Sequence, residues 1–340
     1  MASQYRRSPR LLLTLAVVCT AVTGCSVDIP SPLTGAAAAG HHTTPGASPL
    51  ASLGMVVGSD PLAFWDPAVM PGGAPMITAK AGILVDVDTG EILWQRDPHL
   101  ALAPASTTKV LTALVALENL NPELEVTITP GALGQSAADT RMGLKAGETL
   151  SVTELLEGML LPSGDDAASA IAADTVGTAK FVATMNAQVA ALGLSDSHFT
   201  NTSGLDAPGL RASAYDLAAI AAFTYDDFPL FDQIVATPSV QLPATIDHPA
   251  FHLRNLDALL SDYPAAVGIK PGWTGDAGAC LIGMAIRNGH RLVAVLLNAA
   301  YPARLEARLL DWGFSVEGMR PLLPPTPTPH PTAAASSTRS

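Results

Sequence analysis

The chain has 340 residues, 48% of them hydrophobic and only 14% charged, which is enough apolar material to bury a substantial core in one or two domains. Its formal net charge of −12 argues against nucleic-acid binding, because a nucleic-acid-binding protein needs a basic surface to displace counterions. We therefore expect a compact protein with no nucleic-acid partner.

The first 25 residues indicate where the protein is located. Arg6, Arg7 and Arg10 precede an apolar stretch, residues 11–22, that is too short to span a bilayer comfortably. Small residues and then Cys25 follow, a pattern that resembles a bacterial lipobox, in which the cysteine is lipidated and becomes the new N-terminus. We expect an exported protein, held by a lipid anchor on Cys25 at the outer face of the cell membrane or in the cell envelope. The alternative is an ordinary signal peptide that is cut nearby, with Cys25 incidental.

Composition divides the chain into four parts. We expect a lipoprotein signal peptide over residues 1–24, a flexible tether over 25–74, a catalytic domain over 75–318 and a disordered tail over 319–340. The tether is rich in Pro, Ala, Gly, Ser and Thr, and the tail in Pro, Thr and Ser. Neither part shows the hydrophobic periodicity that a core requires.

The spacing of cysteine and histidine predicts neither a metal site nor a disulfide. His41 and His42 lie in the tether, where adjacent histidines are usually solvated, and no other His, Cys and Asp cluster has ligand spacing. Cys280 lies in an apolar run and is left without an intramolecular partner once Cys25 is acylated, so we expect it to be buried and inert. We expect no metal and no cofactor.

Strand patterns occur at both ends of the predicted catalytic domain. Residues 82–87 and 91–95 flank an Asp-Thr-Gly turn, which is a good hairpin signal. Near the C-terminus, strand-like runs cover residues 267–273, 278–287 and 290–298, and an Asn-Gly turn joins the last two.

The chain between these strands is mainly helical. Hydrophobic periodicity predicts helices over residues 107–117, 152–160, 167–174, 178–192 and 214–223. Strands at both ends of a helical middle predict an α/β chain of the α+β type, with an antiparallel sheet flanked by helices and a mainly helical lobe. The cleft between the lobe and the sheet edge is expected to collect Ser106, Ser163 and Lys270.

Ser106 and Lys109 form the most informative pair. Ser106 opens the first predicted helix, and Lys109, three positions later, shares its face. A serine hydroxyl is a poor nucleophile at neutral pH, and a nearby lysine whose pKa is lowered by burial can accept its proton. Unpaired N–H groups at the helix N-terminus can also hold an oxyanion. Taken alone, the Ser-x-x-Lys pattern has a commoner origin, a serine N-cap followed by a solvated lysine.

Two later segments favour the catalytic interpretation, because they follow in the order found in penicillin-recognising serine enzymes. That superfamily carries Ser-x-x-Lys, Ser-x-Asn and Lys-Thr-Gly elements. Here Asp165 replaces the asparagine that should follow Ser163, and Pro271 replaces the threonine that should follow Lys270.

The surrounding sequence resembles the D-alanyl-D-alanine carboxypeptidases, the low-molecular-weight penicillin-binding proteins of the serine β-lactamase/transpeptidase-like superfamily. The resemblance covers roughly residues 75–315, and its motifs lie in residues 81–117, 192–206, 213–218 and 255–264. It implies a β-lactamase/transpeptidase-like fold. It also implies a serine-type D-alanyl-D-alanine carboxypeptidase that shortens peptidoglycan stem peptides and is acylated by β-lactams.

The resemblance further implies a role for each site residue. Ser106 is expected to form the acyl-enzyme after Lys109 has taken its proton, and Ser163 to relay a proton to the leaving amine. Lys270 is expected to attract the substrate carboxylate, and the backbone N–H groups of Ser106 and Trp273 to form the oxyanion hole. The other residues expected at the substrate are Asp165, Gly272 and Thr274.

Asp165 and Pro271 depart from the family pattern. An ionised aspartate only accepts hydrogen bonds, and a carboxylate beside Lys109 is expected to raise the pKa of that lysine and make it a poorer base. Asp165 and Asp166 are also suited to capping the helix that follows them. Pro271 predicts an edge strand, because proline cannot donate to a ladder. The resemblance places this edge at the cleft, where it can pair with an extended substrate peptide. Loss of the threonine hydroxyl is expected to weaken or alter substrate binding.

Other functions fit parts of the sequence. A wall-binding protein that has lost turnover is the alternative that Asp165 and Pro271 motivate. A class A β-lactamase uses a glutamate after the second element, whereas this chain has none between Glu157 and Glu306. A Ser-His-Asp hydrolase is disfavoured, because no serine lies in a G-x-S-x-G elbow. The sequence leaves open carboxypeptidase, endopeptidase and strand-exchange chemistry.

Overall fold

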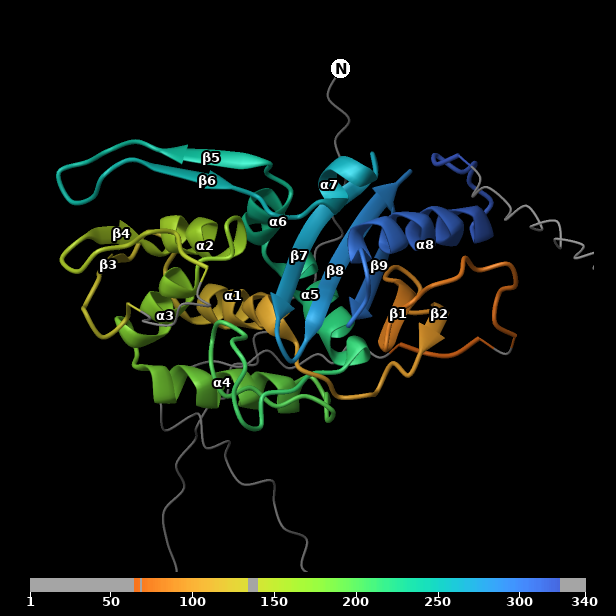
Figure 1. Cartoon of the computed structure of the whole chain (residues 1–340), viewed down its shortest axis with the longest axis horizontal. Helices are drawn as coiled ribbons and strands as arrows, with labels where there is room; N and C mark the ends of the chain where they lie inside the picture. The colour runs from red at the N-terminus through yellow and green to blue at the C-terminus, as the bar shows by residue number, and fades with distance from the viewer. Residues whose placement is uncertain (1–63, 68, 134–139, 325–340) are drawn as a thin grey trace, which may run out of the picture. The chain divides into compact units, whose positions relative to one another are not determined.

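A five-stranded antiparallel sheet organises the structure (Figure 1). The computed structural model describes residues 64–67, 69–133 and 140–324. All described residues belong to one compact unit. The strands of the main sheet are β1 (Ala81–Asp86), β2 (Ile92–Arg96), β7 (Ala266–Thr274), β8 (Gly278–Arg287) and β9 (His290–Leu297). Their order is β2-β1-β9-β8-β7, so β7 is an edge strand.

Turn residues set the register of the sheet. Asp86 Oδ1 accepts hydrogen bonds from the amides of Asp88 and Thr89, which closes the turn between β1 and β2. Between β8 and β9, Asn288 and Gly289 have φ angles of 52° and 88°. Both central residues of this two-residue hairpin are therefore left-handed, as the Asn-Gly pair predicts.

The described part of the chain also contains eight α-helices. They are α1 (Thr108–Asn119), α2 (Val152–Leu160), α3 (Asp165–Ala173), α4 (Thr178–Ala191), α5 (Ala214–Asp227), α6 (Pro229–Val235), α7 (Leu259–Asp262) and α8 (Pro302–Val316). Two small antiparallel hairpins are formed by β3 (Glu125–Thr127) with β4 (Thr149–Ser151), and by β5 (Ser239–Leu242) with β6 (Phe251–Arg254).

Local capping explains where several helices begin. Ser151 and Glu154 form a capping box at α2, in which each side chain bonds the backbone N–H of the other residue. Ser213 caps α5 by accepting a hydrogen bond from the amide of Asp216. Pro302 occupies the first turn of α8, where its missing N–H costs nothing.

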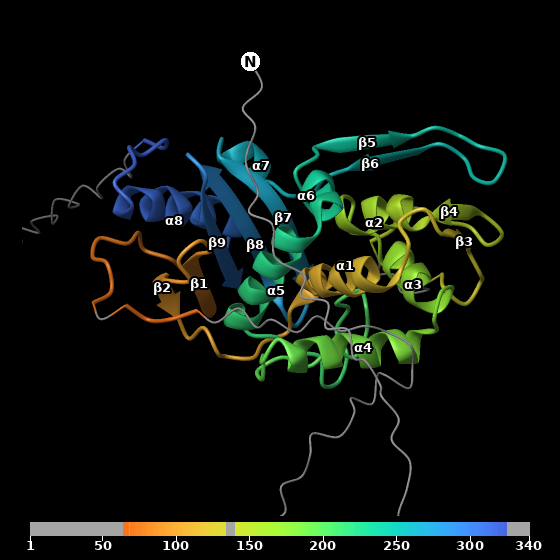
Figure 2. The same ribbon diagram turned by 180° about the vertical axis from the view of Figure 1, so that it is seen from behind.

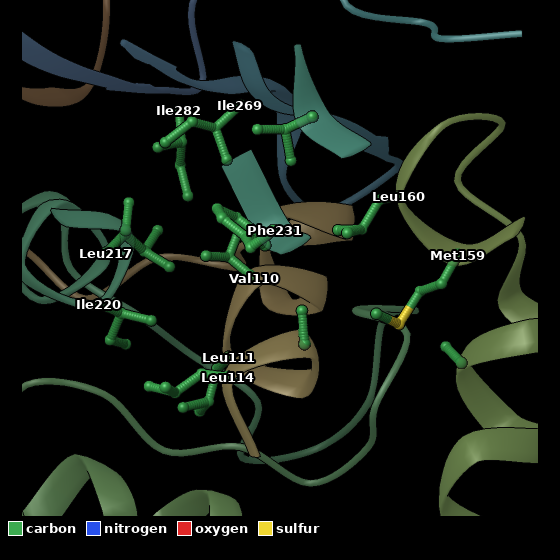
Figure 3. Close-up of a cluster of buried hydrophobic side chains, with 14 of the residues drawn as sticks. Val110, Leu111, Leu114, Met159, Leu160, Leu217, Ile220, Phe231, Ile269 and Ile282 are labelled. Carbon is green, nitrogen blue, oxygen red and sulfur yellow. The ribbon is translucent and has the colours of Figure 1, made fainter. Parts of the chain in front are cut away.

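The main sheet is covered on both faces. Helix α8 lies on the face toward the viewer in Figure 1, and α5 lies on the face toward the viewer in Figure 2. Side chains along β9 alternate between the two cores: Val293 and Val295 join the core that includes α1 and α5, whereas Leu292 and Ala294 join the core that includes α8. The first core is the larger and extends from the sheet through α1 to α2 and α3 (Figure 3).

The predicted fold class is confirmed: the chain is a mixed α/β structure with an antiparallel sheet flanked by helices. Pro271 lies on an edge strand as predicted. Cys280 is buried and unpaired, as predicted, and burial raises the pKa of its thiol to about 11.

The predicted signal peptide, Cys25 and most of the predicted tether and tail lie outside the described residues. Where the predicted tether and tail adjoin the predicted catalytic domain, their described residues form hydrogen bonds with residues of that domain. The amide of Trp65 donates to the carbonyl of Gly90 at 3.0 Å, and the amides of Leu322 and Leu323 donate to the carboxylate of Asp311. Among the described residues, no helix combines the length and the apolar character that a bilayer crossing requires.

Glu306 is an acidic residue inside the core beneath the sheet. Its side chain, on α8, is fully buried and lies against Gly283 of β8, where an added Cβ would come within 2.2 Å of Glu306 Oε2. The amide of Leu296 favours the ionised form, but neither carboxyl oxygen is in hydrogen-bond geometry with a donor of the described residues. Burial, and secondly the carboxylate of Asp257, raises the pKa of Glu306 well above its usual value.

Substitution Glu306→Gln is expected to stabilise the protein at neutral pH. The folded chain keeps the Glu306 carboxyl protonated up to a higher pH than the unfolded chain does. This group therefore makes the free energy of unfolding fall as pH rises above about 4.5. A neutral glutamine removes this dependence of stability on pH. Urea unfolding should show a gain of at least about 1 kcal/mol at pH 7 that disappears at about pH 4. The exposed Glu123→Gln variant is the control, and equal pH slopes for Glu306→Gln and the unsubstituted protein would contradict the assignment.

Candidate active site

Ser106 lies on a tight turn that two glycines allow to pack closely. It belongs to a 3₁₀ turn, Ala105–Thr107, directly before α1, rather than to the first turn of the α-helix as the sequence predicted. The preceding residue, Ala105, is left-handed with φ 50°. A Cβ on Gly204, whose φ is +88°, would lie 1.8 Å from the Ala105 carbonyl oxygen, and a Cβ on Gly272 would lie 2.7 Å from Ser106 N. Only glycine allows both approaches.

The ammonium group of Lys109 lies at the centre of the site. Lys109 is fully buried, and its Nζ donates to Ser106 Oγ at 2.9 Å. The same nitrogen donates to Asp165 Oδ1 at 2.5 Å and to the backbone carbonyl of Ser203 at 2.7 Å. Three different segments therefore supply acceptors to this one amine. One of these acceptors is the Ser106 hydroxyl, which the sequence predicted to be the nucleophile.

The carboxylate of Asp165 is held from its other side. Its Oδ2 accepts a hydrogen bond from the amide of Thr140 at 2.9 Å. The Thr140 hydroxyl donates to the carbonyl of Ser163 at 2.6 Å. Asp165 also opens α3, where the helix dipole favours a negative charge. These contacts hold the carboxylate so that its other oxygen, Oδ1, lies against Lys109.

Asp166 has a separate, structural position. Its carboxylate accepts hydrogen bonds from four backbone amides: Met142, Gly143, Leu144 and Ala167. The last of these amides is in the first turn of α3, but the N-cap of that helix is Gly164 and no side chain caps it, so the capping expected of Asp165 and Asp166 is not found. Asp166 thus ties the segment after Thr140 to the start of α3, and the two neighbouring aspartates are used differently.

Ser163 faces the site in a strained conformation. It is left-handed, with φ 64°, and only 5% of its surface is exposed. Its Oγ is buried and has no hydrogen-bond partner among the described residues. A buried hydroxyl without a partner is uncommon, and such atoms occur where a ligand or a reacting group completes the site.

Lys270 is a residue of β7, the edge strand that borders the site. It is fully buried, and its Nζ donates to the Pro271 carbonyl at 3.2 Å. Burial, and secondly the positive charge of Lys109, lowers the pKa of Lys270 to about 7, while the carboxylates of Asp257 and Asp165 oppose this shift in part. Lys270 is therefore a cation that is easily neutralised.

A cavity of about 330 Å³ opens above these groups. It is lined by Ser106, Thr140, Ser163, Asp165, Leu205, Leu256, Pro271, Gly272, Trp273, Thr274, Ala279, Cys280 and Pro302. All of the predicted site residues except the two lysines are in this set, and the lysines are buried beside it. Trp273 is 71% exposed at the rim, whereas the Thr274 hydroxyl donates to Asp206 Oδ1 at 2.6 Å.

Sequence reasoning missed three of the contacts around Lys109 and Ser106. Thr140 and the carbonyl of Ser203 bond the central ion pair, and Gly204 makes room for the turn at Ala105. Gly204 belongs to a segment that carried the family resemblance, so a positional signal was present there. Nothing in the local sequence marks Thr140, because its contacts come from distant segments.

Potential metal ligands gather elsewhere in the described part of the chain. Asp86, His290 and Glu317 place their ligand atoms within 4.8 Å of one another, and two of these residues are exposed. None of them lines the cavity beside Ser106. The arrangement around Ser106 is thus a hydroxyl, two buried amines and a carboxylate, which is a set suited to acyl transfer on serine.

Known proteins are similar to this chain over more than two thirds of its length. Residues 69–301 match the model of the peptidase family S11, D-alanyl-D-alanine carboxypeptidase. A D-alanyl-D-alanine carboxypeptidase of Mycobacterium tuberculosis is 38% identical over 262 residues, which cover 74% of this chain and 88% of that protein. One from Bacillus subtilis is 33% identical over 253 residues, 72% of this chain, and this chain spans only 64% of its length.

Among solved structures, the Streptomyces K15 DD-transpeptidase is similar, with a TM-score of 0.66 and 29% sequence identity. The similarity covers 72% of this chain and 99% of that chain.

Proposed function

The chain belongs to the D-alanyl-D-alanine carboxypeptidase family and is therefore a peptidase, and we propose that it removes the terminal D-alanine of peptidoglycan stem peptides through an acyl-enzyme on Ser106. The observation that carries the proposal is the 2.9 Å hydrogen bond between the Ser106 hydroxyl and the fully buried amine of Lys109. β-Lactams would acylate the same hydroxyl. Neither a metal nor a cofactor has a part in this reaction.

Ser106 acts as the nucleophile. Its Oγ attacks the carbonyl carbon of the penultimate D-alanine, Lys109 takes the hydroxyl proton, and the C–N bond to the terminal D-alanine breaks. The amine of the departing D-alanine takes up a proton. Water then cleaves the ester on Ser106 and restores the hydroxyl. Ser163 is the relay to the departing amine, a role supported by its unpaired, buried hydroxyl in the cavity wall.

The developing oxyanion is held by backbone N–H groups of Ser106 and Trp273. Support comes from the close approach of β7 to the turn that carries Ser106, which the absence of a side chain at Gly272 makes possible. Donors on two separate segments that are fixed by packing need no reorganisation during the reaction. The free edge of β7 offers the same substrate a strand to pair with.

Lys270 attracts the terminal carboxylate of the substrate. Its charge is sensitive to its neighbours, because a second ammonium, Lys109, is one cause of its lowered pKa. Coupling between two such groups is reciprocal, so protonation of Lys270 favours loss of the proton from Lys109. A substrate that needs Lys270 charged would thereby favour the state in which Lys109 is able to act as a base.

A binding protein without turnover is the second candidate, and one observation favours it. Asp165 stands 2.5 Å from Lys109 and favours the charged form of that amine, which cannot accept a proton. The two candidates differ in whether D-alanine is released.

Substitution Ser106→Ala is expected to abolish both reactions. Incubation with a fluorescent penicillin followed by intact-mass measurement should show one adduct on the unsubstituted protein and none on Ser106→Ala. Release of D-alanine from diacetyl-L-lysyl-D-alanyl-D-alanine should likewise be lost, by at least about a thousandfold. Ser239→Ala, an exposed serine on β5, is the matched control and should keep both. An adduct without any D-alanine release would favour the binding protein, and an adduct on Ser106→Ala would refute the proposal.

The pH dependence of acylation should reveal whether Lys270 binds the substrate carboxylate. Because the pKa of Lys270 is lowered to about 7, the side chain is charged below that pH and neutral above it. Benzylpenicillin carries a carboxylate, and its methyl ester does not. Between about pH 6 and about pH 8, the second-order rate constant for acylation by benzylpenicillin should therefore fall by a factor about ten times larger than that for the ester. Parallel profiles for the acid and the ester would show that Lys270 does not bind the carboxylate.

The same proposal places the protein in the cell envelope, where the stem peptide is found. We propose that residues 1–24 are a signal peptide and that Cys25 carries the lipid anchor, both of which lie outside the described residues. Cells fed labelled palmitate should transfer the label to this protein and not to a Cys25→Ala variant. A Cys25→Ala variant that keeps the label would contradict the anchor.

A further inference from the structure

Large apolar side chains are exposed on the loop that leads into β1. The loop covers residues 65–80 and lies along the outer strand β2 (Figure 1). Val69 is 83% exposed and Met76 is 91% exposed, and Met70 is also exposed. Single exposed apolar residues are ordinary in a soluble domain, but a group of them marks an interaction surface. The loop therefore has the composition of a contact surface.

Hydrogen bonds hold this loop against the sheet. Near its start, Gln95 Nε2 of β2 donates to the carboxylate of Asp66 at 2.7 Å. Near its end, the Arg96 guanidinium donates to the carbonyl of Ala79 at 3.4 Å. Between these points, Gly73 lies beside α8, where an added Cβ would be 3.9 Å from a tryptophan nitrogen. The apolar side chains are thus presented by a loop that is attached at both ends and in the middle.

The last described residues of the chain lie beside the same loop. Gly73 and Pro75 of the loop line a cavity of about 260 Å³ together with Leu323 and Pro324. Leu322, next to them in the chain, is 49% exposed. The loop and the C-terminal segment therefore contribute to one surface, which we call the apolar end. The side chains that define the apolar end are Val69, Met70, Met76 and Leu322.

The side chains of the apolar end project outside the neighbouring cavity, since none of the four is among the residues that line it. A protein partner is usually held by side chains that enter well-packed pockets, whereas a bilayer accepts separate apolar side chains without a matching shape. Exposed charges of both signs surround the apolar end, among them Lys80, Arg320, Asp66 and Glu317. Charge therefore selects neither an anionic nor a cationic partner, and the contact is apolar.

The position of the proposed lipid anchor identifies the partner. Residues 26–63 connect Cys25 to Phe64, which directly precedes the loop. With acyl chains on Cys25, the chain enters the described domain beside the apolar end, and the bilayer is the surface to which the domain is linked. Such a link raises the local concentration of lipid around the loop. A contact too weak to hold the protein on a membrane unaided is then occupied.

The apolar end and the cavity beside Ser106 lie at opposite edges of the main sheet. The loop is bonded to β2, whereas the cavity is lined by Gly272 and Trp273 of β7. Four strand spacings of about 4.8 Å separate these two edges, about 19 Å in all. A bilayer in contact with the apolar end would leave the cavity open to substrate.

Resting on the lipid anchor proposed above, we infer that the apolar end docks on the surface of a phospholipid bilayer. Val69, Met70 and Met76 enter the boundary between the headgroups and the acyl chains, and Leu322 joins them from the C-terminal segment. Docking fixes the orientation of the catalytic domain, which a lipid anchor alone does not. The cavity beside Ser106 then lies at the edge of the sheet that is farther from the lipid.

The test measures whether position 76 lies in lipid. The full-length, lipid-anchored protein with the substitution Met76→Cys is labelled with the environment-sensitive nitrobenzoxadiazole fluorophore and reconstituted on phosphatidylcholine vesicles, which carry no net charge. Cys280 is buried and does not take the label. Docking places the label about 5–10 Å into the boundary between headgroups and acyl chains, so nitroxide-bearing lipids should lower its fluorescence at least about twofold.

Ile246→Cys is the matched control. Ile246 is 98% exposed and lies between β5 and β6, at the other end of the described unit in Figures 1 and 2. A label there should show no quenching by lipid. In the Met76→Cys protein, adding Val69→Ser and Met70→Ser should lower the ratio of docked to undocked label by about tenfold or more, because two apolar side chains no longer leave water.

Any of several results would overturn the inference. Equal quenching at positions 76 and 246, no quenching at 76 while the protein stays on the vesicles, or quenching that survives both serine substitutions would show an anchor without docking. A blue-shifted label at position 76 that lipid quenchers do not reach would show that protein, such as a second copy of the chain, covers the loop. A protein that leaves the vesicles would refute the anchor as well. These measurements do not depend on D-alanine release, so a failure of the proposed activity is recorded separately.

Discussion

The buried contact between Lys109 and Asp165 is the interaction on which the rest of the site depends. A charged amine with no exposed surface is tolerable only if its partners are in place, and removal of one member of such a pair typically costs about 3–5 kcal/mol. The partners come from α3, from the segment at Ser203 and from the turn at Ser106. Holding this one amine therefore fixes three segments relative to each other, and the hydroxyl of Ser106, the proposed nucleophile, is one of the groups so fixed.

A second constraint is the close approach of backbones around Ser106. Gly204 and Gly272 each lie where a Cβ would collide with the turn, so the distance between the hydroxyl and the edge of β7 is set by the backbone alone. This arrangement brings a nucleophile, N–H donors and an unpaired strand edge into contact with one cavity. The position of Pro271 on that edge leaves the strand paired on one side and open on the other.

Local sequence was sufficient where local chemistry decides the structure. The Asp-Thr-Gly and Asn-Gly turns predicted two hairpins of the main sheet, β1–β2 and β8–β9. Hydrophobic periodicity identified the residues of α2 without error, and a capping box marks its start. Helix α8 was not predicted. Its buried Glu306 occupies a position on the apolar face, and only packing against Gly283 of β8 explains a carboxyl group there.

The residues of the candidate site were predicted to lie together, but most of the contacts that hold them were not predicted. Two short motifs predicted that Ser106, Lys109 and Asp165 lie together, and the pairing of Asp165 with Lys109 was anticipated from charge alone. The roles of Thr140 and Ser203 were not, because a backbone carbonyl and a loop threonine carry no sequence signal until the chain has folded. The 3₁₀ turn at Ser106 was also missed, since it depends on the room left by Gly204 and Gly272.

The most direct measurement is the pH profile of acylation by benzylpenicillin for Asp165→Asn. If the carboxylate keeps Lys109 charged, its removal should let the amine act as a base at lower pH, and acylation at about pH 7 should become about tenfold faster. An unchanged profile, or acylation that is slower at every pH in a folded variant, would contradict the view that the Asp165 carboxylate restrains the reactivity of Ser106.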